Sequence, residues 1–378
     1  MRSNDEFWAN GTIPWLKTEQ LGEKYIFDTN EHITEKALQE ANVKIFPENT
    51  LSIAMYGEGK TRGNVSILKR PMATNQACCN IELDAEKVSS EYVYYFLKTQ
   101  YENLRGLSSG IRKNLNTNDI KNFVVRLPEN LKTQQSIAAV LSALDKKIAL
   151  NKQINARLEE MAKTLYDYWF VQFDFPDANG KPYKSSGGEM VFDETLKREI
   201  PKGWEVKNLG DWAEIRKGTL ITEKTANTNG DIKVISAGVD FSYYHDVANR
   251  PKNTITISAS GANAGFVNFW REPIFACDCT TITNRVIGST LYILNFLKIV
   301  QDFIYQQARG SAQPHVYPKD IEGLKIIVPP DLLLKRFSEF VENWNLKIAN
   351  NEKQNHQLTQ LRDFLLPMLM NGQVSVAE

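Results

Sequence analysis

The 378-residue sequence has few cysteines and few histidines, four of each. Cys78 and Cys79 are adjacent, and Cys277 and Cys279 are separated by one residue. This spacing matches neither a disulfide framework nor the repeated CxxC pattern of a zinc site. We therefore expect reduced, buried thiols and no metal centre.

Long apolar runs and net charge are also missing. No stretch approaches the roughly 18 apolar residues that cross a bilayer, and residues 1–5 contain no apolar signal region, so we expect a cytoplasmic protein. The 45 basic residues balance 45 acidic ones, so any surface for nucleic acid must be a local basic patch. With 42% hydrophobic residues, the chain can bury a core in more than one domain.

Motifs for catalysis are absent too. The sequence contains no GxxxxGK[ST] phosphate loop, no Asn-Pro-Pro-aromatic methyltransferase motif and no GxGxxG after a strand. Pro176-Asp177, followed much later by Glu205 and Lys207, resembles a nuclease metal site. That pattern is common by chance, and Asp177 lies in a segment rich in Gly and Pro that predicts a poorly positioned carboxylate. We expect a chain without catalytic activity.

An internal repeat about two hundred residues long is the main feature of the sequence. The run Asn-Thr-Leu-Ser-Ile at 49–53 returns as Asn-Thr-Ile-Thr-Ile at 253–257, and Arg105-Gly106 returns as Arg309-Gly310. Solenoid repeats are about 20 to 50 residues long, so this period indicates two copies of one domain. Short alternating runs broken by Gly and Pro predict strands and tight loops in a mixed α and β fold.

Each copy ends in a long segment with apolar residues at alternating steps of three and four, which predicts a long helix with a heptad seam. Such a stripe needs a partner helix, and we expect the two seams to pack on each other, in an orientation that the seams alone leave open. Asn at equivalent seam positions predicts a defined register. The predicted seam residues are Ile137, Leu141, Leu144, Ile148, Asn151, Leu158, Leu165, Phe337, Val341, Trp344, Ile348, Asn351, Leu358 and Leu365.

These patterns predict five segments. They are a first domain at 1–127, a central helix at 128–175, a loose linker at 176–199, a second domain at 200–328 and a distal helix at 329–378.

Two similar domains held by a rigid rod suit the reading of two half-sites on duplex DNA. Two loop regions in each domain are rich in basic, amide and hydroxyl side chains, which bond to base edges and phosphates. The alternative is that they are ordinary solvated loops, but their duplication favours DNA binding. The candidate DNA-binding residues are Lys60, Arg62, Asn64, Arg105, Ser108, Arg112, Lys113 and Asn114 in the first domain, and Ser260, Asn263, Arg309, Ser311, Gln313 and His315 in the second.

Several strings resemble the specificity subunit of type I restriction-modification systems, over nearly the whole chain. They include GTIPWLKTEQL, ATNQACC, QQSIAAVLSALDKKIALNKQINARLEEMAKTLYDYWF, REIPKGWEVKNLGD and LRDFLLPMLMNGQV. The resemblance implies an α+β protein with two target-recognition domains joined by two long helices in an antiparallel coiled coil. It also implies a non-catalytic chain that binds double-stranded DNA and modification and restriction subunits, while S-adenosylmethionine, ATP and Mg²⁺ belong to those partners.

The first domain departs from this pattern. The second domain has a segment at 204–218, WEVKNLGDWAEIRKG, for which the first has no counterpart. We expect a shortened first recognition domain, whose sheet edge would be completed by adding such a segment. A rival function follows from it: a scaffold or decoy that occupies modification subunits without reading DNA.

Overall fold

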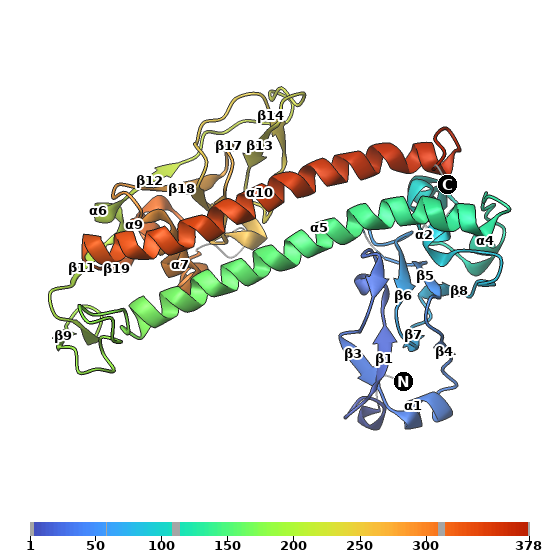
Figure 1. Ribbon diagram of the computed structural model, residues 1–378, viewed down its shortest axis with the longest axis horizontal. Helices are drawn as coiled ribbons and strands as arrows, with labels where there is room; N and C mark the ends of the chain where they lie inside the picture. Colours follow the sequence, from blue (N-terminus) through green and yellow to red (C-terminus); the bar gives the residue numbers. More distant parts are fainter. Residues whose placement is uncertain (1–3, 58, 108–113, 309–313, 377–378) are drawn as a thin grey trace. The chain divides into compact units, whose positions relative to one another are not determined.

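The computed structural model describes residues 4–57, 59–107, 114–308 and 314–376. The chain divides into two compact units, one formed by Met1–Ala149 with Asn355–Glu378 and the other by Leu150–Gln354. Two long helices, α5 (Leu131–Tyr166) and α10 (Asp331–Met370), are each shared by the two units, with one part in the first unit and the other part in the second (Figure 1).

Two small sheets form the globular part of the first unit, with strand orders β3-β1-β7-β4 and β2-β6-β5-β8. Every residue of β5 and β6 is buried, which suits their apolar sequences LSIA and VSIL. The strands are β1 (Ile13–Leu16), β2 (Tyr25–Ile26), β3 (Glu31–Ile33), β4 (Ile45–Phe46), β5 (Leu51–Ala54), β6 (Val65–Leu68), β7 (Met72–Thr74) and β8 (Cys78–Ile81). The shorter helices are η1 (Asp5–Phe7), η2 (Thr18–Gln20), α1 (Glu35–Glu40), α2 (Ser90–Thr99), α3 (Tyr101–Gly106) and α4 (Thr117–Lys121).

The second unit contains a four-stranded sheet, β12-β18-β15-β16, and a three-stranded sheet, β14-β13-β17, besides the pairs β10-β9 and β11-β19. Its strands are β9 (Met190–Asp193), β10 (Arg198–Pro201), β11 (Glu205–Asn208), β12 (Ala213–Lys217), β13 (Ile232–Ile235), β14 (Tyr243–His245), β15 (Thr254–Ser258), β16 (Val267–Trp270), β17 (Ile274–Ala276), β18 (Cys279–Asn284) and β19 (Lys325–Val328). Its shorter helices are η3 (Asp167–Val171), α6 (Leu209–Trp212), η4 (Gly261–Asn263), α7 (Thr290–Ile299), α8 (Gln301–Gln306) and α9 (Pro318–Glu322).

The sequence repeat has a structural counterpart in the two units. In both, a central strand lies between two antiparallel neighbours, β6-β5-β8 in the first unit and β16-β15-β18 in the second. The tyrosine hydroxyls of α2 and α7 also bond alike, because Tyr92 donates to the Arg126 carbonyl at 3.4 Å and Tyr292 to the Ile327 carbonyl at 2.6 Å. The predicted pair of mixed α/β domains is confirmed.

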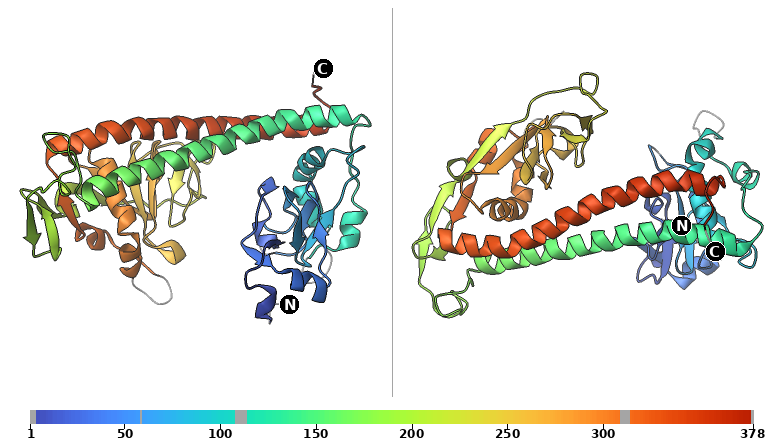
Figure 2. Two further views of the ribbon diagram at one scale, coloured as in Figure 1. Left: turned by 60° about the horizontal axis from the view of Figure 1, so that its bottom comes forward. Right: turned by 45° about the horizontal axis from the view of Figure 1, so that its top comes forward.

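Helices α5 and α10 run antiparallel, as the family resemblance implied. In the second unit Asn151 donates to Gln354 at 2.7 Å, while Asn351 donates to Asn155 at 2.8 Å. In the first unit Arg362 of α10 pairs with Asp145 of α5 at 2.9 Å. Partner numbers thus rise along one helix as they fall along the other, and Figure 2 shows the two helices side by side.

The expected seam residues differ in their exposure. Asn151 and Asn351 are buried, and so are the apolar residues Ile137, Leu141, Ile148, Phe337, Val341 and Ile348. The other six are half-buried: Leu144, Leu158, Leu165, Trp344, Leu358 and Leu365. Toward the helix ends the stripe also contacts the cores of the globular parts, because Leu141 belongs to the first core and Phe337 to the second.

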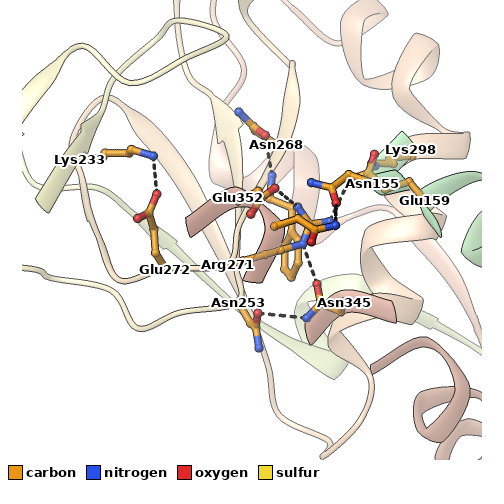
Figure 3. A network of polar contacts seen from close by, with 12 residues as sticks. Asn155, Glu159, Lys233, Asn253, Asn268, Arg271, Glu272, Lys298, Asn345 and Glu352 are labelled. Atoms are coloured by element: carbon orange, nitrogen blue, oxygen red, sulfur yellow. Dashed lines mark hydrogen bonds and ion pairs between the residues drawn. The ribbon is translucent and has the colours of Figure 1, made fainter. Parts of the chain in front are cut away.

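A polar network attaches the second globular part to both long helices (Figure 3). Arg271, which follows β16, donates to Asn345 at 2.8 Å and pairs with Glu352 at 2.7 Å and with Glu159 of α5 at 2.9 Å. Burial raises the pKa of Glu352 even though Arg271 opposes the shift. Arg271 is only 9% exposed, and a buried charge is costly unless it keeps its partners. The contacts with Asn345, Glu352 and Glu159 therefore fix the position of the sheet against the helix pair.

The first globular part has a polar attachment of its own. Lys24, next to β2, donates to Ser142 of α5 at 2.6 Å and to Tyr95 of α2 at 3.1 Å, and it pairs with Glu91 at 3.2 Å. Burial lowers the pKa of Lys24, and the Glu91 carboxylate partly offsets that cost. The buried ammonium group of Lys24 therefore joins the sheet that contains β2 to helices α2 and α5.

The segment expected to be a loose linker is folded, so that prediction is wrong. Strands β9 and β10 form an antiparallel hairpin, and Asp174 accepts hydrogen bonds from the Ser185 amide and hydroxyl at 2.7 and 2.6 Å. The Phe175 ring stacks on Tyr183 and Trp204, with centroids 4.6 and 5.1 Å away. A composition rich in Gly, Pro and Ser is shared by flexible linkers and by tight turns. In this segment these residues form short turns, in which side chains accept hydrogen bonds from the backbone amides.

The nuclease-like carboxylates have structural partners. Asp177 accepts hydrogen bonds from the backbone amides of Asn179 and Lys181, both at 2.8 Å, which caps a turn. Glu205 pairs with Lys207 at 2.8 Å on the surface. These contacts account for both side chains without a metal ion.

Candidate nucleic-acid interface

Two loops meet beyond the central strand of each unit. In the first unit we give the name first loop pair to the segments 55–64 and 107–116, of which the structure describes 55–57, 59–64, 107 and 114–116. The Leu115 amide joins the described parts by donating to the Met55 carbonyl at 3.0 Å. In the second unit the second loop pair is formed by the segments 259–266 and 308–317, of which the structure describes 259–266, 308 and 314–317. Here the Val316 amide donates to the Ala259 carbonyl at 3.0 Å. The same backbone contact therefore holds both loop pairs.

Arg105 fastens the first loop pair. Its guanidinium donates to the Gly59 carbonyl at 2.9 Å, the Arg62 carbonyl at 3.3 Å and the Tyr101 hydroxyl at 2.7 Å. The Tyr101 hydroxyl in turn donates to the Lys60 carbonyl at 2.6 Å. Through these hydrogen bonds Arg105 fixes the backbone at Gly59 and Arg62, while part of its own side chain stays accessible to solvent.

Gly63 makes this contact possible. Its φ is +86°, and an added Cβ would lie 3.1 Å from the Cγ of Arg105. A larger residue would strain the backbone and push the arginine away from the loop.

The other predicted residues of the first loop pair surround this clamp. Lys60 is exposed, while Arg62, Asn64 and Asn114 are half-buried. The side-chain amide of Asn64 donates to the Leu21 carbonyl at 3.1 Å, which links the loop to the segment between η2 and β2. Exposed and half-exposed cations and amides on a fixed backbone suit phosphate and base-edge contacts.

The second loop pair has different chemistry. Ser260 donates to the Asp278 carboxylate at 2.6 Å and forms an isolated bridge with His315. The His315 ring stacks on the Tyr317 ring, with centroids 6.2 Å apart. Asn263 is half-buried at the end of η4. A carboxylate at this position can accept a hydrogen bond from a cytosine amino group.

Six predicted residues lie outside the described part of the chain: Ser108, Arg112, Lys113, Arg309, Ser311 and Gln313. The remaining eight lie in the two loop pairs or directly beside them. Five belong to the first unit, Lys60, Arg62, Asn64, Arg105 and Asn114, and three to the second, Ser260, Asn263 and His315. Their roles in DNA contact stay predictions.

Sequence reasoning missed two residues of these surfaces. Asp278 was overlooked, although its position between Cys277 and Cys279 in a tight strand connection marks it as a fixed polar group. Tyr101 was overlooked because its partner, the Lys60 carbonyl, belongs to the backbone and leaves no pattern in the sequence.

The cysteines fit a structural role. Burial raises the pKa of Cys78 and of Cys279 to about 12, so both thiols stay protonated at neutral pH. Across the described residues, no group of three His, Cys, Asp or Glu side chains is arranged to hold a metal ion. The helices searched in the same residues include none that could span a bilayer.

Comparison with known proteins matches the two halves of the chain to one family. The family model described as type I restriction modification DNA specificity domain matches residues 1–160 and again residues 201–360. The MjaIX specificity subunit of Methanocaldococcus jannaschii is 31% identical, over 99% of this chain and 89% of the relative. The HindI specificity subunit of Haemophilus influenzae is 24% identical, over 78% and 79%.

A solved structure has the same fold. The S subunit of a type I restriction-modification system from M. genitalium superposes with a TM-score of 0.56 at 19% identity, over 95% of this chain and 92% of that one. With two mixed domains and an antiparallel helix pair, the chain belongs to the type I restriction-modification DNA specificity family, as a non-catalytic specificity subunit for DNA target recognition.

Proposed function

We propose that this subunit reads a bipartite DNA target, one half with the first loop pair and the other half with the second. One observation carries this proposal: the two units hold their loops by the same backbone contact but present different side chains. A common geometry with different donors and acceptors suits two half-sites of different sequence.

The antiparallel helix pair would serve as the spacer between the half-sites and as the docking surface for modification subunits. Large apolar side chains stand exposed on both helices, including Leu150, Met161, Phe340, Leu346 and Phe364. Exposed apolar surface of this kind is typical of a partner interface. Modification and restriction subunits would supply S-adenosylmethionine, ATP and Mg²⁺, and the assembled complex would act on DNA in the cytoplasm.

We also propose that the first unit is a shortened recognition domain. Within its described residues nothing corresponds to β11, α6 and β12 of the second unit. This difference keeps a second function open, a scaffold that occupies modification subunits without reading DNA.

Replacing Asp278 by Asn tests the reading function. A carboxylate accepts a hydrogen bond from cytosine, whereas an amide both donates to and accepts from adenine. We therefore expect the preferred base at one position of one half-site to change, with a change in binding free energy between the two bases of about 1–3 kcal/mol. The measurement is selection from a DNA library with both half-sites randomised, using the chain assembled with its modification subunit.

Asp302→Asn on the exposed side of α8 is the matched control and should leave the selected sequence unchanged. A selected pool without sequence preference, for the unaltered chain as well as for Asp278→Asn, would favour the scaffold function.

A further inference from the structure

The first unit contains an apolar groove that none of the functions above uses. It has a volume of about 440 Å³ and is bounded by β8, α2, α4 and residues 123–127. Ile81, Leu97, Phe123 and Val125 are among its lining residues, and of the described residues that line it only Glu82 and Lys121 are charged. Within the described residues β8 is the end strand of its sheet, so a strand edge borders the groove.

In the second unit the corresponding place is filled by β11, α6 and β12. Strand β11 pairs with β19, and β12 pairs with β18 over five residues. Leu209 and Ala213 are fully buried there, and the Trp212 ring meets Tyr292 edge-on at 5.5 Å. A strand, one helical turn and a second strand therefore complete this domain.

The two units differ in exposure at the positions that this segment covers. Ile282 of β18 and Ile326 of β19 are fully buried, whereas their counterparts Ile81 and Val125 are half-buried. Leu127, which corresponds to Val328 of β19, is 37% exposed, and residues 123–127 form no strand. The first unit thus exposes apolar surface that its repeat covers with polypeptide.

Charge specifies the occupant further. Beside the bend of α6, a Cβ added at Gly210 would lie 3.0 Å from the Cβ of Glu322. The first unit has Lys121 at the position of Glu322, so the glycine of such a bend would lie beside Lys121, and an acidic residue directly after that glycine would suit the lysine charge. Residues 204–218 contain that sequence as Gly210-Asp211.

We propose that this groove binds a polypeptide segment with the chemistry of residues 204–218. The segment consists of a strand that pairs with residues 123–127, a bend with apolar anchors and Gly-Asp, and a strand that extends the sheet at β8. This interaction would complete the first domain whether or not that domain reads DNA.

The test uses a fluorescent synthetic peptide of residues 204–218 and the full chain, with fluorescence anisotropy and hydrogen exchange as readouts. We expect saturable binding with protection of residues 78–83 and 123–127. A peptide with Leu209→Asp and Trp212→Asp should bind at least tenfold more weakly, since both anchors are lost. Leu127→Asp in the chain should weaken binding similarly, and the 37% exposure of Leu127 makes this variant compatible with folding.

A charge exchange makes the assignment specific. The peptide with Asp211→Lys should bind the unaltered chain more weakly and regain affinity for the Lys121→Glu chain. The proposal is overturned by absence of binding at millimolar peptide, by equal binding of a scrambled peptide, by protection confined to the second unit, or by no recovery in the charge exchange.

Discussion

Phe337→Ala is expected to lower the free energy of unfolding of the second unit by about 3–5 kcal/mol, the usual cost of removing a buried phenylalanine ring. Phe337 is fully buried, and the rings of Tyr166, Trp169 and Phe170 lie 5.0 to 6.1 Å from it. The substitution leaves a cavity where α10, α5 and the globular core meet. Urea unfolding followed by hydrogen exchange of second-unit peptides measures the loss.

Phe364→Ala is the matched control because Phe364 lies on the same helix with 63% of its surface exposed. It should change stability by less than about 0.5 kcal/mol. If Phe337→Ala proved as mild as this control, α10 would not be a central element of the second core.

Arg105→Ala should weaken binding to the first half-site by about 1–3 kcal/mol and leave recognition of the second half unchanged. The expected cause is a loss of loop order, because the guanidinium bonds to the carbonyls of Gly59 and Arg62. Binding to DNA with either half-site altered, measured on the assembled complex, gives the effect on each half. Hydrogen exchange at residues 55–64 reports the loop directly.

Arg157→Ala provides a control, since Arg157 is 79% exposed on α5 and contacts Glu160. An equal loss of affinity for every DNA sequence after Arg105→Ala would instead assign this arginine to phosphate contact.

Much of the fold could be predicted because the repeat and the apolar stripe are periodic features. The stripe could not reveal helix direction, since a heptad pattern allows both orientations; contacts such as Asn151 with Gln354 establish it. The hairpin at β9 and β10 escaped prediction because Gly, Pro and Ser occur both in tethers and in tight turns. Only the stacking of Phe175 on Tyr183 and Trp204 separates the two cases.

The candidate site was predictable in residue type but not in role. The duplicated Arg-Gly pair directed attention to Arg105, yet its partners are backbone carbonyls of another loop, which carry no side-chain signature. Asp278 was missed for a related reason, because its partner Ser260 is 18 residues away in the sequence and reaches it only through strand pairing.

Exchange of the loop pairs tests the central claim most directly. The second loop pair, residues 259–266 and 308–317, is replaced by the first, residues 55–64 and 107–116, and the complex with modification subunits methylates DNA of known sequence. Mapping of the modified bases should give a motif that carries the first half-sequence in both halves with unchanged spacing. An unchanged motif, or one altered in both halves, would contradict the account.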